Sequence, residues 1–211
     1  MSESSSVKIN HIISLLTDHF GELPWWPGQT DEVMVGAILT QQTRWENVER
    51  ALVHLRGKGL CSLEAIYSGE MQEIEEAIRC TGFYRVKARR LKSLAAHVMG
   101  QYGGTSGMAD IPTGQLRESL LEVSGIGEET ADSILCYALS RTSFVVDAYT
   151  ERMAQCMGVR ERRGELKSII EGVLPKDNYS YRQTHAHIVE YGKKFCGQKR
   201  CSECILLSLK G

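Results

Sequence analysis

Apolar side chains recur at intervals of three and four residues along most of the chain, and this spacing limits the fold more than any other feature. Ile9, Ile12, Ile13 and Leu16 form one such stripe. An amphipathic stripe of this period is typical of helices. Only four prolines occur, and no pair of alternating segments indicates a β-hairpin. We therefore expect an all-α protein of about ten short helices. The same spacing continues in six later segments, residues 33–55, 74–78, 91–98, 116–121, 131–135 and 169–173.

Net charge and cysteine content exclude several classes of protein. The formal net charge is -1, so any attraction to nucleic acid must be local. Two basic runs, Arg85–Lys92 and Lys193–Arg200, either supply that attraction or are solvated faces. Seven cysteines and a polar segment at residues 1–6 argue against a secreted protein. We expect no membrane span and an intracellular, cytoplasmic location.

The most informative local pattern is Ser124, Gly125, Ile126 and Gly127, between two apolar helical stripes. Two glycines around one apolar residue allow a tight turn in which Ile126 anchors in the core. The next helix should start at about Glu128, which places the glycine N–H groups at its positive end. Such a set of donors suits a phosphodiester and reads the backbone of a nucleic acid. The pattern alone also fits an ordinary turn between two helices.

The sequence around this turn resembles the endonuclease III superfamily of helix-hairpin-helix DNA glycosylases (HhH-GPD). This resemblance implies a DNA repair enzyme that flips a damaged base out of double-stranded DNA and hydrolyses its N-glycosidic bond. It implies that Gly125, Ile126, Gly127 and Thr130 bind DNA phosphates. Four segments carry the resemblance in the family's order: residues 35–52 with a Gln-bearing turn, the helix pair 82–98, the hairpin and following loop 120–153, and the C-terminal region 185–204.

The resemblance also implies two helical lobes. Residues 30–141 would form a helical-barrel lobe that ends in the hairpin. Residues 1–29 would pack with residues 142–211 as a terminal lobe that carries a Cys-rich C-terminal loop. The catalytic site is expected in the cleft between the lobes, in a Gly/Pro…Asp loop that includes Asp147. Nothing indicates an obligate dimer, so we expect a monomer.

Asp147 follows the apolar run 144–146, twenty residues after Gly127. In the family the matching aspartate is the catalytic carboxylate, and the chemistry agrees with that role. Cleavage of a glycosidic bond develops oxocarbenium charge on the sugar, and a fixed carboxylate stabilises this charge or orients the attacking water. Asp147 also fits the N-cap of a helix that starts at Ala148, and one residue can do both.

Glu129 occupies the position at which strand-nicking members of the family carry a Schiff-base lysine. A carboxylate cannot form the imine, and the preceding residue, Glu128, is also acidic. The sequence therefore predicts a monofunctional glycosylase, without AP-lyase activity, that uses water and leaves an abasic site.

All three tryptophans fall within a short segment, as Trp25, Trp26 and Trp45, and Pro27 follows the first two. They are candidates for core packing or for stacking on a flipped base, and electron-rich indoles favour a cationic base. The layout resembles the 3-methyladenine DNA glycosylase branch of the superfamily, which surrounds an alkylated purine with a Trp-Trp-Pro edge and a second aromatic. This resemblance makes an alkylated purine such as 3-methyladenine the leading substrate.

Two adjacent glutamines precede Trp45. Gln42 matches the family residue that fills the gap left by the flipped base, and Gln41 is the neighbouring candidate. An amide can hydrogen-bond the orphaned partner base, although a surface glutamine without a role fits the sequence as well.

Three cysteines near the end, Cys196, Cys201 and Cys204, resemble the family's [4Fe–4S] loop. The fourth family cysteine would fall at Lys210, and its loss counts against a bound cluster. The chemistry requires no cofactor. A degenerate site, a cluster completed by another type of ligand, a chain that ends short of the fourth ligand and a zinc site all remain open. The other four cysteines, Cys61, Cys80, Cys136 and Cys156, look like small buried hydrophobes.

Two alternative functions fit the same motifs. One is a mismatch glycosylase that removes adenine or thymine from a mispair. The other is a non-catalytic DNA-binding module, because hairpins of this kind also occur as phosphate grips alone.

Overall fold

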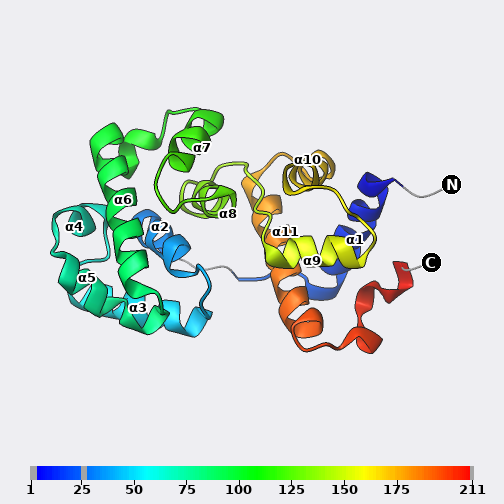
Figure 1. The fold of residues 1–211 in the computed structure, drawn as a ribbon. Helices are drawn as coiled ribbons and strands as arrows, with labels where there is room; N and C mark the ends of the chain where they lie inside the picture. The colour runs from blue at the N-terminus through cyan, green and yellow to red at the C-terminus, as the bar shows by residue number, and fades with distance from the viewer. Residues whose placement is uncertain (1–3, 25–27, 210–211) are drawn as a thin grey trace. The chain divides into compact units, whose positions relative to one another are not determined.

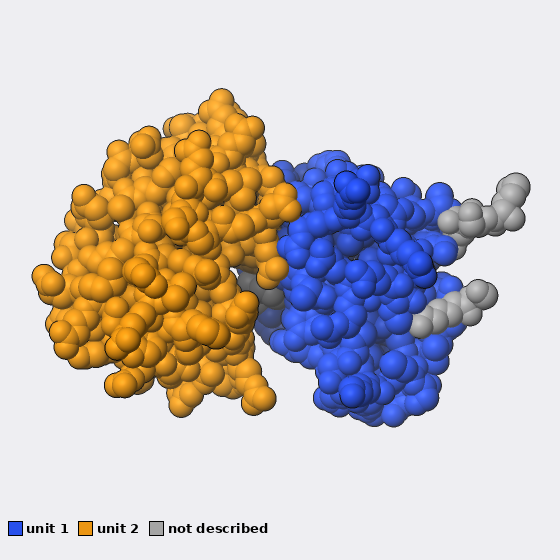
Figure 2. Space-filling view, viewed as in Figure 1, with its two compact units in different colours: residues 1–26, 142–211 blue, residues 27–141 orange. Residues whose placement is uncertain are grey.

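The computed structural model describes residues 4–24 and 28–209. Within these ranges the chain forms eleven α-helices, several short 3₁₀ and π turns and no strand, which confirms the all-α prediction. None of the described helices is long and apolar enough to cross a membrane. The chain divides into two compact units, one of residues 27–141 and one of residues 1–26 with 142–211 (Figure 2).

The unit of residues 27–141 is built around its longest helix, α6 (Tyr84–Tyr102), which contacts α2, α4 and α5 (Figure 1). Leu91, Leu94 and Val98 of α6 are fully buried, as their spacing predicts. The other helices of this unit are α2 (Thr30–Leu39), α3 (Trp45–Gly57), α4 (Leu63–Ser68), α5 (Met71–Ala77), α7 (Thr113–Leu121) and α8 (Glu128–Ser133). A π-helical turn, Ile134–Ala138, continues α8.

One member of the first basic run lies inside this unit. Lys87 is only 1% exposed, and its ammonium donates to the carbonyls of Leu39 (2.8 Å) and Thr81 (3.0 Å). Burial, with a contribution from the charge of Arg90, lowers the pKa of Lys87 to about 8. Lys87 therefore ties the end of α2 to α6 and does not belong to an exposed basic face.

The second unit joins the N-terminal helix α1 (Ser5–Phe20) to the last third of the chain. Its other helices are α9 (Ala148–Cys156), α10 (Arg163–Val173) and α11 (Asn178–Tyr191). Helix α1 contacts α10 and α11, and α11 contacts α9. The apolar stripe Ile9, Ile12, Ile13 and Leu16 lies in this core, as predicted. Short 3₁₀ and π turns carry the chain from Gly192 to Leu209.

Candidate functional site

The hairpin forms where the glycine pattern predicts it. Helix α7 ends at Leu121 and α8 begins at Glu128, and the Ile126 amide donates to the Val123 carbonyl at 3.0 Å. The Ile126 side chain is buried and anchors the turn. Gly127 is the N-cap of α8, with extended backbone and open space where a side chain would project. The start of α8 is therefore open to an approaching ligand.

Gly125 is required by its surroundings. Its φ of 88° lies in the left-handed region, which favours glycine. A Cβ at this position would come within 2.5 Å of the Arg90 Cγ. The middle of the Arg90 side chain thus packs against the bare face of the turn, and α6 supports the hairpin from outside the motif.

Gln41 connects the glutamine turn to the same hairpin. Its amide nitrogen donates to the Gly125 carbonyl (3.2 Å) and to the Thr130 hydroxyl (3.0 Å), and its amide oxygen accepts from Arg90. Both ends of this amide are committed inside the unit. Gln41 is therefore less suited than its neighbour to fill a gap in a DNA duplex, and the mostly buried Thr130 points its hydroxyl toward Gln41.

Gln42 differs from Gln41 in exposure and in backbone. It is exposed and has a φ of 53°, which a residue other than glycine or asparagine seldom adopts. Such strained positions cluster at functional sites. The turn therefore presents the Gln42 side chain to solvent while Gln41 holds the turn on the hairpin.

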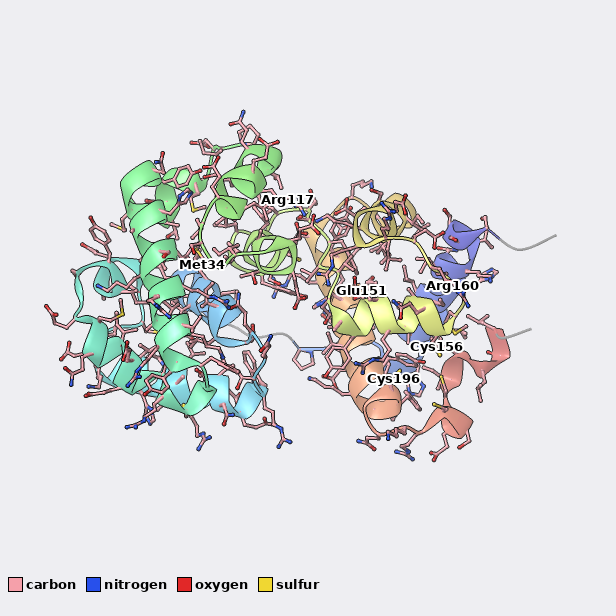
Figure 3. All side chains as sticks on the ribbon, viewed as in Figure 1. Met34, Arg117, Glu151, Cys156, Arg160 and Cys196 are labelled. Carbon is pink, nitrogen blue, oxygen red and sulfur yellow. The ribbon has the colours of Figure 1, made fainter. Side chains whose placement is uncertain are left out.

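A charged contact links the two hairpin helices. Arg117 of α7, labelled in Figure 3, donates to both carboxylate oxygens of Asp132 on α8 (2.8 and 3.2 Å) and lies 3.4 Å from Glu128. The Asp132 side chain is nearly fully buried, so this bidentate pair is shielded from water. The pair fixes the angle between α7 and α8, and with it the shape of the turn.

Asp147 is the N-cap of α9, as one interpretation of the sequence predicts. One oxygen, Oδ1, accepts from the Thr150 amide and from the Thr150 hydroxyl, each at 2.8 Å. The other oxygen, Oδ2, lies 3.6 Å from Nε2 of His185 on α11. The side chain remains 13% exposed. The carboxylate is thus held in one orientation and still reaches solvent.

These contacts keep Asp147 ionised. Burial alone would raise the pKa of its carboxyl, but the nearby His185 ring and the two Thr150 donors outweigh burial and lower the pKa to about 2. A carboxylate with so low a pKa is a weak base and a persistent negative charge. The arrangement suits stabilisation of a cation.

Helix α10 holds the segment that leads to Asp147. Three of its charged residues, one turn apart from each other, contact the backbone or side chains of residues 143–146. The Glu171 carboxylate accepts from the Phe144 amide (2.8 Å), and Lys167 donates to the Phe144 carbonyl (3.0 Å) and the Ser143 hydroxyl (2.8 Å). Arg163 donates to the Val146 carbonyl at 2.7 Å.

Arg163 also makes a bidentate pair with Glu151 of α9 (3.1 and 2.9 Å). Glu151, labelled in Figure 3, lies one turn into the helix that Asp147 caps. One guanidinium therefore bridges the residue before Asp147 and the helix after it. We call Arg163, Lys167 and Glu171 the α10 clamp.

The remaining predicted site residues divide into two groups. Trp45, at the start of α3, is 36% exposed, and Glu129 is exposed in the first turn of α8. Trp25, Trp26 and Pro27 lie outside the described residues. The structure therefore gives an accessible indole at position 45 and no account of the Trp-Trp-Pro edge.

The C-terminal cysteines come together in the second unit. Cys196, Cys201 and Cys204 line one hollow, and Cys156 from the end of α9 lines it as well. The prediction that Cys156 is a buried hydrophobe is wrong, because Cys156 is exposed. Cys61 and Cys80 are half-buried, and only Cys136 of that group is fully buried.

Several residues that shape the site were not identified from the sequence. His185 and the α10 clamp act across long sequence separations, and Arg90 appeared only as part of a basic run. The one available signal was the spacing of Arg163, Lys167 and Glu171, which places three charges on one helical face. That pattern is common on solvated helices and points to no particular partner.

The family model for the HhH-GPD superfamily of base excision DNA repair proteins matches residues 35–176. This range contains the hairpin, the glutamine turn, Asp147 and α10. A protein of Methanocaldococcus jannaschii, whose name provisionally describes it as a DNA repair glycosylase, is 46% identical over 97% of this chain and 96% of its own length. Endonuclease III of Thermotoga maritima is 26% identical over 82% of this chain and 79% of its own.

Two solved structures show the same fold. The 3-methyladenine DNA glycosylase MagIII of H. pylori, bound to 1,N6-ethenoadenine, superposes with a TM-score of 0.80 at 29% identity and covers 88% of this chain and 97% of its own. Endonuclease III in a non-covalent DNA complex gives a TM-score of 0.81 at 22% identity, over 98% and 95%. The chain has the endonuclease III-like fold and belongs to the HhH-GPD superfamily of base excision DNA repair glycosylases.

Proposed function

We propose that this DNA glycosylase is monofunctional and removes an alkylated purine, such as 3-methyladenine, from double-stranded DNA. The observation that carries the proposal is the state of Asp147: a carboxylate held by Thr150 and His185, with its pKa at about 2 and part of its surface open to solvent. Its negative charge is present whenever a cation forms next to it.

The chemistry follows from that charge. The N-glycosidic bond breaks and its electron pair goes to the base nitrogen, while the sugar becomes an oxocarbenium ion that Asp147 stabilises. Water then adds its oxygen to the anomeric carbon and releases a proton to solvent. A carboxylate with so low a pKa is poorly suited to accept that proton, so its role is electrostatic. An alkylated purine that carries positive charge leaves as a neutral base and needs no general acid.

The hairpin unit supplies the grip on DNA. Gly125, Ile126 and Gly127 would bind a phosphate through the backbone at the open start of α8, and Thr130 would hold the turn through Gln41. This grip is independent of base sequence, which suits an enzyme that must act at any damaged position.

The flipped base and its partner need different groups. Trp45, with Trp25, Trp26 and Pro27, would form the pocket for the base, and the exposed Gln42 would fill the gap in the duplex. The MagIII structure of H. pylori supports the substrate class, because that relative is named for 3-methyladenine and was solved with 1,N6-ethenoadenine.

Strand cleavage by a lyase step is not part of the proposal. Glu129 stands where a Schiff-base lysine would be required, and it is exposed on α8. A carboxylate cannot add to the sugar carbon to form an imine. Incubation with damaged duplex and borohydride should therefore trap no covalent adduct.

A panel of duplexes tests the function. The protein should release 3-methyladenine from alkylated DNA. Release of 7-methylguanine from the same DNA is measured separately, and oxidised and mispaired duplexes are tested in parallel. Release of adenine or thymine from a mispair in place of alkylpurines would assign the protein to the mismatch glycosylases. Tight binding of every duplex without release of any base would make it a non-catalytic DNA-binding module.

A further inference from the structure

The basic run Arg85–Lys92 on α6 divides into residues with different tasks. Arg85 lies 3.8 Å from the Glu75 carboxylate, and Lys87 is buried inside the unit. Arg90 is half-buried, and its side chain lies against the hairpin. The run therefore does not form one solvated face, and Arg90 is the member that meets the turn proposed to bind a phosphate.

The Arg90 side chain is held on the hairpin at two points. Its Cγ, Cδ and Nε lie 2.5 to 2.6 Å from the position that a Cβ of Gly125 would take. Its guanidinium donates to the Gln41 amide oxygen, while the Gln41 amide nitrogen donates to the Gly125 carbonyl and the Thr130 hydroxyl. The charge of Arg90 is therefore fixed beside the turn, so less side-chain freedom is lost when a ligand binds there.

The charge of Arg90 has no carboxylate partner within residues 4–24 and 28–209. Its bonded neighbour Gln41 is a neutral amide, and the nearby Lys87 donates to two backbone carbonyls. Burial, and after it the charge of Arg90, lower the pKa of Lys87 to about 8, so the two cations act on each other. A half-buried cation without a counter-ion is costly, and an anion that docks beside it lowers that cost.

The hairpin helices themselves bring negative charge to this place. Helix α8 begins with two acidic residues, Glu128 and Glu129, and carboxylates repel a phosphate. Arg117 lies 3.4 Å from Glu128 but also donates to both oxygens of Asp132. One guanidinium thus faces two carboxylates, and this group carries net negative charge. A phosphodiester at the turn therefore gains most from a cation that comes from outside α7 and α8.

We propose that Arg90 is a phosphate-binding residue, whose guanidinium contacts the same phosphodiester as the backbone of Gly125 and Gly127. Gln41 is the positioning residue that holds this guanidinium in place. The inference rests on the phosphate grip of the proposed function and adds a charged member to it. A guanidinium suits the task, because its planar N–H groups match phosphate oxygens in pairs. The contact involves no base, so it serves any damaged position.

Binding of the full chain to a duplex with an uncleavable abasic analogue tests the assignment at several salt concentrations. Arg90→Met keeps an unbranched side chain over Gly125 but removes the charge. It should weaken binding about tenfold at low salt and reduce the slope of log Kd against log salt by about 0.9. Arg90→Lys restores the charge and should recover the wild-type slope. Arg89→Met removes the exposed cation one position earlier and is the matched control, with unchanged affinity and slope.

Duplexes with a single methylphosphonate, an uncharged linkage, locate the contact. Wild-type protein should lose affinity about tenfold when one particular phosphate is replaced. Arg90→Met and Gly127→Ala should each be less sensitive than wild type to replacement of that same phosphate. Melting curves check that the variants are folded, and Arg90→Gln supplies the same loss of charge if Arg90→Met melts early.

Three outcomes would overturn the proposal. An equal loss of slope in Arg90→Met and Arg89→Met would reduce the effect to overall charge. If Arg90→Met stayed as sensitive as wild type to the linkage that Gly127→Ala no longer senses, the backbone grip would stand without Arg90. If wild-type protein were insensitive to every single replacement, the phosphate grip itself would fall, and Arg90 with it.

Discussion

The hairpin and the Asp147 segment expose different parts of the chain to a ligand. The hairpin presents backbone: the Arg90 side chain packs against Gly125 where a Cβ would lie, and Gly127 opens onto empty space. The Asp147 segment presents a side chain: the α10 clamp bonds to the backbone of Phe144 and Val146, and the Asp147 carboxylate stays partly exposed. A phosphate can be held by N–H groups wherever a turn exposes them, whereas an oxocarbenium ion needs a charge that does not move.

The largest expected effect separates the two roles of Asp147. Asp147→Asn removes the charge but keeps an oxygen that can accept from Thr150, so the cap of α9 survives. We expect excision to fall by about 10³-fold, and the free energy of unfolding to fall by no more than the roughly 2 kcal/mol that the ionised carboxylate contributes. Base release and a melting curve measure the two effects. A variant that loses stability without a matching loss of excision would reduce Asp147 to a helix cap.

The α10 clamp should matter for rate and not for DNA affinity. Arg163→Lys keeps the charge but loses the bidentate contact with Glu151 and the link to the Val146 carbonyl. A small shift of Asp147 would lower the single-turnover rate by roughly ten- to a hundredfold. Arg162→Lys, at the neighbouring N-cap of α10, is the matched control and should leave the rate unchanged. Weakened DNA binding with a normal rate would contradict this role.

Alanine substitutions at the two glycines of the hairpin should have different effects, one on stability and the other on DNA affinity. Gly125→Ala places a Cβ against Arg90 at a positive φ and should cost about 1–3 kcal/mol in the free energy of unfolding. Gly127→Ala meets nothing inside the protein, so stability should hold while DNA affinity falls about tenfold. Urea unfolding and a DNA titration measure the pair. Equal loss of stability in both would mean that Gly127 also serves the fold.

The smallest effect concerns pH. Because the pKa of Asp147 is lowered from 3.8 to about 2, its ionised form stabilises the folded protein above pH 4, and that contribution is lost as the pH falls toward 2. The shift corresponds to about 2 kcal/mol. His185→Gln should move the pKa of Asp147 upward, so that stability is lost at a higher pH than in wild type. Identical acid unfolding of the two proteins would show that His185 contributes nothing to the charge of Asp147.

Local patterns predicted most of the fold and the hairpin. The stripes around Ile9 and Leu91 and the Gly125 turn act over a few residues, so spacing alone reveals them. The α10 clamp, His185 and the Arg90 contact could not be found in this way, because each joins residues that lie 12 or more positions apart in the sequence. Lys87 and Cys156 show the same limit: a lysine among exposed cations is buried, and a cysteine assigned to the core lies at the surface.

The most direct test measures single-turnover excision and DNA affinity side by side for Asp147→Asn and Gly127→Ala. If backbone grip and fixed charge are separate functions of separate units, Asp147→Asn will lose rate and keep affinity, and Gly127→Ala will lose affinity and keep its rate at saturating enzyme. Two variants that each lose both properties to the same degree would contradict this division.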